Sequence, residues 1–323
     1  MPHAIRFHQT GGPEVLCWEE VAVGDPAPGE ARVRHEAIGL NFIDTYHRGG
    51  LYPLPLPSGL GREGAGVVEA VGEGVTDIKP GDRVAYGTGP LGAYSEVRCM
   101  PADRLHKLPD GIDFKTGAAM MLQGMTTAYL LLHTYPVQSG DKVLIHAAAG
   151  GVGLIACQWA KALGATVIGT VSSEAKAELA RKHGCDHVIL YTQEDVASRV
   201  REITGEGVAV VYDGVGKDTF MASLDSLRRR GLLVTFGNAS GAVPPFDPLL
   251  LSKKGSLYVT RPVLDHYSTT RAELLALGNA LFDVVLAGKV KIEVNQTYAL
   301  ADAAQAHRDL EARKTTGSTV LLP

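Results

Sequence analysis

The sequence predicts an α/β protein with a doubly wound parallel sheet in the middle of the chain and an antiparallel, barrel-like domain around it. Between residues 142 and 262, near-continuous apolar runs alternate with amphipathic stretches of helical length. This alternation is typical of parallel strands covered on both faces by helices. The N-terminal third instead alternates polar and apolar residues between glycine-rich turns, as antiparallel strands do. A chain of 323 residues is long enough for two such domains.

The middle of the chain predicts six strands, which together make a doubly wound sheet of the dinucleotide-binding type. The expected strands are 142–149, 166–172, 187–191, 208–216, 232–238 and 256–262. The expected helices between them are 154–163, 174–183, 194–204 and 218–230. The last of these helices is expected to run through three consecutive arginines and to stop at Gly231, because glycine commonly ends helices.

The two ends of the chain predict the second domain. Residues 31–38 alternate in a period of two, and a turn at 79–82 leads into the apolar segment 83–86. After Pro262 the pattern predicts a helix at 271–288, a strand at 291–298, a helix at 302–312 and a last strand at 318–323. We expect these C-terminal elements to return to the first domain, which makes the parallel-sheet domain an insertion.

Composition excludes several classes of protein. The net charge of −4 gives no electrostatic footprint for nucleic acid or for an acidic membrane surface. No apolar stretch approaches the roughly 18 residues that a membrane span needs, and the N-terminus lacks the pattern of a secretory signal. The four cysteines are far apart and form no C-x-x-C pair, which favours reduced thiols. We therefore expect a cytoplasmic protein with no nucleic-acid partner and no membrane association.

The segment HAAAGGVG (146–153) is the strongest functional signal, because it stands between a strand and a helix. Glycines at this place let the backbone approach a pyrophosphate, whose charge is met by amides at the helix N-terminus. The spacing Ala147, Gly150, Gly153 differs from the usual G-x-G-x-x-G pattern, so a tight turn without a ligand is the alternative. The surrounding βαβ pattern favours dinucleotide binding. The expected contacts are Ala149, Gly150, Gly151 and Val152.

The end of the next strand indicates which dinucleotide is bound. An acidic side chain there would hold the ribose 2′-hydroxyl of NAD, but the strand ends in Ser172 and Ser173, with Lys176 close behind. Hydroxyl groups and a lysine suit a 2′-phosphate, so NADPH is favoured over NADH. Glu174 is a counter-signal, and Lys176 as a solvated helix residue is the alternative. Tyr191, at the end of the third strand, is expected to pack on the adenine or to cap the sheet edge.

Several long segments agree in order and spacing with those of one known family. They are AIGLNFIDTYHRGGLYPLPLPSGLGREGAG (37–66), the glycine-rich segment with its helix (146–165) and VVYDGVGKDTF (210–220). The agreement continues in RRRGLLVTFGNASGAV (228–243), KGSLYVTRP (254–262) and the closing KTTGSTVLLP. Over essentially its whole length, the sequence therefore resembles the quinone oxidoreductases of the medium-chain dehydrogenase/reductase superfamily.

The same comparison of residues predicts no metal. Zinc members of the superfamily hold a catalytic ion with a cysteine and a histidine, and usually with one more ligand. In this chain Asn41 stands at the cysteine position, and Arg62 stands where the Gly-His-Glu pattern has histidine. The four closely spaced cysteines that hold a structural zinc in many relatives are also absent.

The resemblance implies a GroES-like catalytic domain made of residues 1–124 and 265–323, with a dinucleotide-binding domain at 125–264. It implies that Asn41, Asp44 and Tyr46 line the nicotinamide side of the cofactor site. Four further cofactor contacts are implied, namely Thr127, Phe236, Gly237 and Asn238. It also implies a homodimer, in which the strand near SLYVTRP extends a sheet across the interface.

The implied chemistry is hydride transfer from the nicotinamide to a quinone without a metal. Tyr46 and Tyr52 are the candidates for hydrogen-bonding the substrate oxygen, and Asn41 for positioning it. For each tyrosine, packing at the wall of the site is the alternative. An NADPH-dependent reductase of enones or alkenals needs the same features and stays open. A nucleotide-bound structural or RNA-binding protein is a third possibility, disfavoured by the negative net charge.

Overall fold

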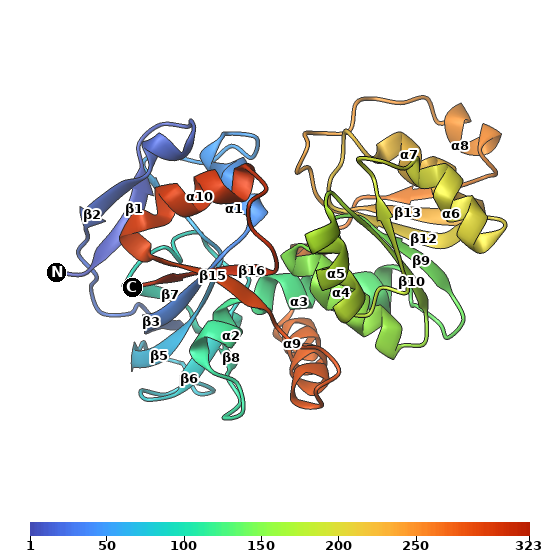
Figure 1. Cartoon of the computed structure of the whole chain (residues 1–323). Coiled ribbons are helices and arrows are strands. Elements are labelled where there is room, and N and C mark those ends of the chain that lie inside the picture. The colour runs from blue at the N-terminus through green and yellow to red at the C-terminus, as the bar shows by residue number, and fades with distance from the viewer. The chain divides into compact units, whose positions relative to one another are not determined.

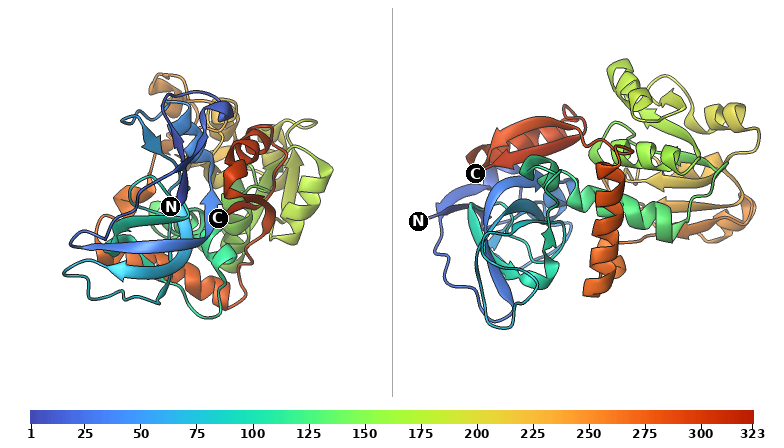
Figure 2. Two further views of the ribbon diagram at one scale, coloured as in Figure 1. Left: turned by 90° about the vertical axis from the view of Figure 1, so that its left-hand side faces the viewer. Right: turned by 90° about the horizontal axis from the view of Figure 1, so that it is seen from below.

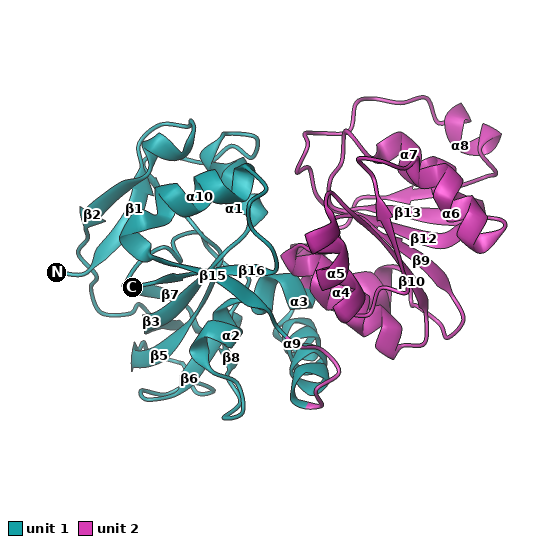
Figure 3. Cartoon of the chain, viewed as in Figure 1, with its two compact units in different colours: residues 1–125, 268–286, 292–323 teal, residues 126–267, 287–291 magenta.

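The computed structural model describes residues 1–323 and divides the chain into two compact units (Figure 3). Unit 1 comprises Met1–Met125, Ser268–Leu286 and Ile292–Pro323, and unit 2 comprises Thr126–Tyr267 and Ala287–Lys291. The sequence placed the boundaries at 124/125 and 264/265, and it did not anticipate that 287–291 belongs with unit 2.

Unit 2 is built on a six-stranded parallel sheet (Figure 1). Its strands are β9 (Lys142–Ile145), β10 (Thr166–Val171), β11 (His187–Leu190), β12 (Val208–Asp213), β13 (Leu227–Thr235) and β14 (Tyr258–Thr260). The strand order is β11-β10-β9-β12-β13-β14, which is the 3-2-1-4-5-6 order of doubly wound dinucleotide-binding sheets. The predicted fold class of the middle segment is confirmed.

The helices of unit 2 connect these strands. They are α4 (Gly151–Ala162), α5 (Glu174–Lys182), α6 (Val196–Thr204), α7 (Phe220–Ser226) and α8 (Leu249–Lys253). A π-helical turn at Leu130–Thr134 follows α3 (Met121–Tyr129) at the start of the unit. Asp195 begins α6 by accepting a hydrogen bond from the Ser198 N–H at 2.8 Å, which satisfies one of the free donors of the first turn.

One helix prediction was wrong at its C-terminal end. The helix expected to reach Arg230 ends at Ser226, and the three arginines belong to the first half of β13. Leu227 pairs with Val208 of β12 and is almost completely buried. The burial of this leucine in the sheet outweighs the helical propensity of the arginines. It depends on a tertiary contact, which local propensity does not include.

The strand before the glycine-rich segment also differs from its prediction. It stops at Ile145 instead of residue 149, because Ala147 adopts a left-handed backbone conformation with φ 53°. Ile145 pairs with both Gly169 of β10 and Tyr212 of β12, so the sheet is intact up to this point. The apolar residues 147–149 therefore form the turn and not the strand.

Unit 1 contains a seven-stranded sheet and a three-stranded sheet (Figure 1). The larger sheet consists of β3 (Glu30–Leu40), β5 (Glu63–Val71), β6 (Arg83–Tyr86), β7 (Val97–Pro101), β8 (His106–Lys107), β15 (Val294–Ala299) and β16 (Ser318–Leu322). The smaller sheet consists of β1 (His3–Phe7), β2 (Cys17–Glu20) and β4 (Ser58–Gly59). The helices are α1 (Phe42–Arg48), α2 (Phe114–Ala118), the first part of α3 as far as Met125, α9 (Arg271–Leu286) and α10 (Ala303–Glu311).

The C-terminal segment returns to the first domain, as predicted. Strand β16 pairs antiparallel with β3, bringing Leu321 opposite Ile38. Strand β15 pairs with β16 in parallel, so the expected all-antiparallel sheet has one parallel pair at its edge. Helix α10 connects these two strands, because a parallel pair needs a crossover. Both chain ends lie close together on unit 1 (Figures 1 and 2).

Each unit has its own apolar core. In unit 1 the core includes Phe7, Ile38 and Leu321, so strands from both ends of the chain contribute to it. In unit 2 it includes Leu144 of β9 and Leu233 of β13, packed with side chains of the covering helices. None of the helices is long and apolar enough to cross a membrane.

Candidate active site

The glycine-rich segment forms a tight turn from β9 into α4. The Gly150 N–H donates to the Ala147 carbonyl at 2.9 Å, and no side chain caps the helix that begins at Gly151. Because the first N–H groups of a helix have no intrahelical partner, this uncapped end offers backbone donors and a partial positive charge. A Cβ on Gly153 would lie 2.3 Å from the Ala147 carbonyl oxygen, so only glycine fits there. These features suit a pyrophosphate group.

A buried hydrogen-bond network supports this turn from below. His146 Nδ1 lies 2.9 Å from Thr170 Oγ1 on β10, and its Nε2 lies 3.0 Å from Ser223 Oγ on α7. Ser223 Oγ in turn donates to Asp213 Oδ2 at 2.7 Å, at the end of β12. Burial lowers the pKa of His146, so the imidazole is neutral and can act as both donor and acceptor. The network ties together the carboxyl ends of three strands.

The second strand of unit 2 ends without a free carboxylate. Ser172 follows β10 directly and is half-buried, and Ser173 is exposed at the start of α5. The carboxylate of Glu174 lies 2.6 Å from the Arg181 guanidinium, so its charge is paired within α5. Lys176 is half-buried on the same helix. The negative charge next to the predicted 2′-phosphate site is thus partly neutralised.

The other cofactor residues expected in unit 2 also follow the carboxyl ends of parallel strands. Tyr191 follows β11 with 42% of its surface exposed, and Phe236, Gly237 and Asn238 follow β13. A Cβ on Gly237 would lie 2.3 Å from the Gly214 carbonyl oxygen, so these two loops pass in close contact. Thr127 differs from this group, because it lies in α3 and is completely buried. Apart from Thr127, all predicted cofactor residues of unit 2 lie at or just after the carboxyl ends of its strands.

In unit 1, Asn41 is held by hydrogen bonds at both ends of its side-chain amide. Its Nδ2 donates to Glu63 Oε2 at 2.5 Å, and its Oδ1 accepts from Gln123 Nε2 at 3.0 Å. The Ser318 hydroxyl lies 2.8 Å from Gln123 Oε1, which fixes the orientation of the glutamine as well. Asn41 is 5% exposed and immediately precedes α1. Its amide therefore has one defined orientation.

Glu63 is the buried acid at the centre of this cluster. Burial raises its pKa to about 8, although the donors on Asn41 and on the Leu122 backbone favour the charged form. Such a shift identifies a carboxyl group held in a low-dielectric site by its surroundings. The sequence pointed to Arg62 as the residue replacing histidine and assigned Glu63 no role. An acid directly before the run of small residues 64–66 was the available signal.

A second buried chain of hydrogen bonds ends at Asp44. Arg48 Nη1 donates to His307 Nδ1 at 2.8 Å, so the other ring nitrogen carries the proton and faces the Tyr94 hydroxyl at 3.1 Å. Tyr94 then donates to Asp44 Oδ2 at 2.9 Å. Burial lowers the pKa of His307 to about 3 and raises that of Asp44 to about 7.

Asp44 also fixes the start of α1. Its Oδ2 accepts from the Asn41 backbone N–H at 2.9 Å, which joins this second chain to the residue that precedes the helix. Asp44 therefore caps the first turn of α1 as well as ending the buried chain of hydrogen bonds.

Tyr46 and Tyr52 lie next to each other. Their rings meet edge to face with centroids 5.4 Å apart, and Tyr46 also packs against Phe42. Tyr46 is 9% exposed and Tyr52 is half-buried. Arg48 donates hydrogen bonds to the Gly11 carbonyl, His307 and Glu311. Its role is to anchor α1 to α10.

Known proteins match the chain along its whole length. The family model described as alcohol dehydrogenase GroES-like domain matches residues 27–110, and that described as zinc-binding dehydrogenase matches 151–276. A quinone oxidoreductase of Pseudomonas aeruginosa is 59% identical over 325 residues and is covered completely, as is this chain. The crystal structure of Escherichia coli quinone oxidoreductase complexed with NADPH is 54% identical, with a TM-score of 0.98 over 99% of this chain and 100% of that one.

The chain belongs to the quinone oxidoreductase family of medium-chain dehydrogenases/reductases. The family includes proteins named for other acceptors. A 2-haloacrylate reductase of a Burkholderia species is 52% identical, with 100% of this chain and 99% of that protein covered. Family membership confirms the predicted fold class and the predicted resemblance.

Proposed function

We propose that this chain is an NADPH-dependent quinone reductase that transfers a hydride from the nicotinamide to a quinone without a metal. The main support for the proposal is the set of loops and the helix N-terminus that lie together at the carboxyl ends of the unit 2 strands. Helix α4 begins without a side-chain cap, and the backbone of the preceding turn lies so close to Gly153 that no side chain fits there. The NADPH complex of a relative 54% identical to this chain supports the same assignment.

Backbone amides and polar or cationic side chains of unit 2 would bind the two negatively charged parts of NADPH, the pyrophosphate and the 2′-phosphate. The pyrophosphate would be bound by backbone amides of Ala149, Gly150, Gly151 and Val152. Ser172, Ser173 and Lys176 would bind the 2′-phosphate, since Glu174 is paired with Arg181. The remaining proposed contacts are Asn41, Tyr46, Thr127, Tyr191, Phe236, Gly237 and Asn238. Unit 2 would thus be the dinucleotide-binding domain, and unit 1 the catalytic domain.

The cofactor, when bound, supplies the hydride, and the side chains of unit 1 have two tasks. Asn41 would present one fixed amide orientation, because Glu63 and Gln123 occupy its nitrogen and oxygen. Tyr46 or Tyr52 would donate a hydrogen bond to the acceptor carbonyl, stabilising the negative charge that develops on it. The quinone oxygen can take its proton late or from water, so no strong general base is required.

We propose the reduction of enones or alkenals as the second candidate. A relative 52% identical over the whole chain is named for a haloacrylate, whose carbon–carbon double bond is conjugated to a carbonyl group. The same hydride donor can attack either type of acceptor. The choice depends on the shape of the acceptor pocket and not on the cofactor contacts.

Two further assignments belong to this proposal. We expect a cytoplasmic protein, consistent with four cysteines that are all free thiols. We also expect a homodimer, because β14 is the edge strand of its sheet and an uncovered edge is a template for pairing.

The test is to follow the oxidation of NADPH and NADH by absorbance against matched panels of quinones and enones. Turnover of NADPH with benzoquinone and naphthoquinones, with kcat/KM well above that for enones, is the expected result. Turnover with enones alone would contradict quinone reduction and support the second candidate function, the reduction of enones or alkenals. Tight NADPH binding without turnover of either panel would contradict both, and isothermal titration of NADPH separates that outcome from a failure to bind cofactor.

A further inference from the structure

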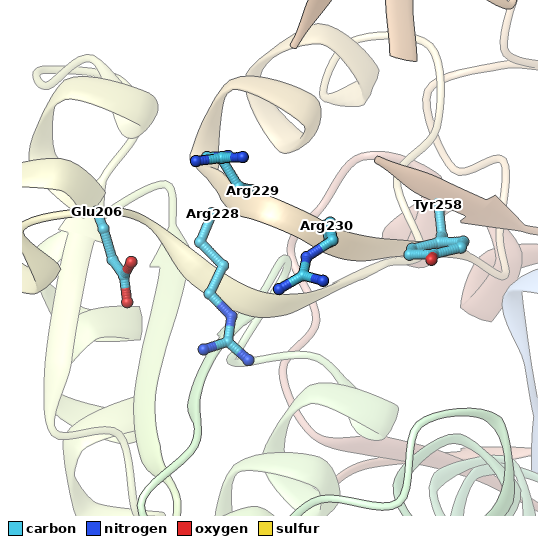
Figure 4. A pocket seen from close by; sticks show the side chains of 5 residues that line it. All are labelled: Glu206, Arg228, Arg229, Arg230 and Tyr258. Carbon is cyan, nitrogen blue, oxygen red and sulfur yellow. The ribbon is translucent and has the colours of Figure 1, made fainter. Parts of the chain in front are cut away.

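Three consecutive arginines surround a pocket in unit 2 that the proposed function does not use (Figure 4). The pocket has a volume of about 580 Å³ and is lined by Glu206, Arg228, Arg229, Arg230 and Tyr258. That volume is in the range of small-molecule sites. Arg228 and Arg230 extend to one side of β13 and Arg229 extends to the other, with the Tyr258 ring beyond Arg230 (Figure 4).

The pocket lies at the end of the sheet opposite the glycine-rich turn. Strands β9, β12, β13 and β14 are all parallel, so their first residues share one end of the sheet. Glu206 precedes β12, the arginines occupy the start of β13, and Tyr258 is the first residue of β14. The glycine-rich turn instead follows the last residue of β9. The pocket is therefore distinct from the proposed dinucleotide site.

A bulge in β13 directs the arginines out of the sheet. Val208 faces Leu227 and Val210 faces Leu232, so β13 advances five residues where β12 advances two. Arg230 adopts a left-handed conformation with φ 58°, which glycine takes freely but an L residue takes at a cost. Its N–H donates to the Gly255 carbonyl at 2.9 Å, which holds the conformation. Bulges and strained residues of this kind concentrate at binding sites.

The positive charge of this cluster is not used inside the protein. Arg229 and Arg230 make no side-chain hydrogen bond or ion pair, and Arg228 bonds only to the neutral side chain of Tyr135. The carbonyl groups at the C-terminal ends of α6 and α7 accept hydrogen bonds from other side chains and not from the three arginines. Lys142 donates to the Thr204 carbonyl, and Arg201 donates to the Asp225 carbonyl. Glu206 is the single acid among the lining residues, so cations prevail in the pocket.

We propose that this pocket binds a small phosphorylated molecule. Guanidinium groups recognise phosphate by paired, charge-assisted hydrogen bonds, and an arginine cluster without carboxylate partners is suited to a doubly charged anion. Tyr258, the remaining lining residue, begins β14, whose edge we expect to pair with a second copy, so the arginines alone are assigned to the anion. The net charge of −4 describes the whole chain and does not show this local excess of positive charge.

The test is isothermal titration with inorganic pyrophosphate, carried out on protein saturated with NADPH so that the glycine-rich turn is filled. The double variant Arg228→Ala/Arg230→Ala should weaken pyrophosphate binding at least tenfold, because each lost charge-assisted bond accounts for about a factor of ten or more. The matched control is Arg199→Ala, which removes an equally exposed arginine on α6 that is paired with Glu194 and Glu202. It should leave the affinity unchanged.

A second variant separates binding from folding. Arg230→Gly removes one guanidinium but relieves the left-handed strain, so its melting temperature should equal or exceed that of the parent while pyrophosphate affinity falls. Three results would overturn the proposal: pyrophosphate affinity equal in all variants, binding only of long polyanions in a strongly salt-dependent way, or loss of a dimer instead of anion binding in the double variant. Sedimentation velocity on each variant reads out the last.

Discussion

At the scale of single residues, the carboxyl groups of Glu63 and Asp44 are the most unusual feature of unit 1. Both are completely buried, and burial raises the pKa of Glu63 to about 8 and that of Asp44 to about 7. Each carboxyl group is fixed by neighbours on other elements, Glu63 by Asn41 and Leu122, and Asp44 by Tyr94. Asn41, which is expected to face the nicotinamide, is therefore fixed by Glu63 through its side chain and by Asp44 through its backbone N–H.

We expect the contribution of Glu63 to the stability of the protein to fall as the pH rises from about 4.5 to about 8. The unfolded chain releases the Glu63 proton near the ordinary value of 4.5, whereas the folded chain retains it up to about 8. The native state thus binds more protons between these values, so the free energy of unfolding decreases with pH and levels off above the folded pKa. Urea unfolding measured at several pH values would record this slope.

Glu63→Gln should flatten that slope, because the amide cannot titrate. The control is Glu69→Gln at the exposed end of the same strand, which should leave the slope as it is. An unchanged slope in Glu63→Gln would mean that another group is responsible. A parallel loss of kcat with little change in KM would agree with a positioning role for Glu63 on Asn41.

Lys176 gives the sharpest test of cofactor selectivity at this scale. Lys176→Ala should raise KM for NADPH about tenfold or more and change KM for NADH by less than about twofold, because a charged hydrogen bond to the 2′-phosphate is lost. Steady-state kinetics with both cofactors measures the ratio. Equal effects on NADPH and NADH would remove the 2′-phosphate assignment.

At the scale of elements, the β9–α4 connection shows how a strand and a helix create a site that no side chain provides. The helix approaches the turn so closely that a Cβ on Gly153 would meet Ala147 and Ala148 backbone atoms. The left-handed Ala147 and the uncapped Gly150 leave the amides of the first turn facing outward from the sheet end. The anion site is thus a property of the packing distance between two elements.

Gly153→Ala should push α4 away from this turn. We expect a loss of about 1–3 kcal/mol in the free energy of unfolding, as for other overpacked positions, together with weaker NADPH binding. The control is Gly24→Ala, where a Cβ would meet nothing within 4 Å. Thermal unfolding and fluorescence titration of NADPH measure the two effects, and equal behaviour of both variants would contradict the close-packing argument.

At the scale of the whole molecule, two expectations follow from the composition of the site and from the sheet topology. Asn41 and Arg62 stand where metal-dependent members of the superfamily have ligands, and neither side chain is a usual zinc ligand. A strong chelator should therefore leave NADPH oxidation unchanged. Progressive inactivation by the chelator, with recovery on adding zinc, would contradict the metal-free assignment.

The edge strand β14 leads to the second expectation. Sedimentation velocity should give twice the mass of the 34.2 kDa chain over a wide concentration range, because an edge strand can pair with the same strand of a second copy. A monomer at all concentrations would leave the edge unexplained by dimer formation.

The sequence by itself determined the fold class, the order of strands and helices, the glycine-rich turn and the family. These features depend on periodicity, on the backbone freedom of glycine and on motifs of neighbouring residues, all of which are local. The strand set β9–β14 was predicted almost completely, and the return of β16 to β3 was anticipated.

Only the tertiary structure decided which polar groups are buried together. The contacts Asn41–Glu63, Asn41–Gln123 and Tyr94–His307 join residues separated by 22, 82 and 213 positions. The three arginines were assigned to a helix from local propensity, whereas the burial of Leu227 against β12 places them in a bulged strand beside a pocket. Burial, which sets these pKa values and these conformations, depends on contacts between distant segments, and no local pattern records it.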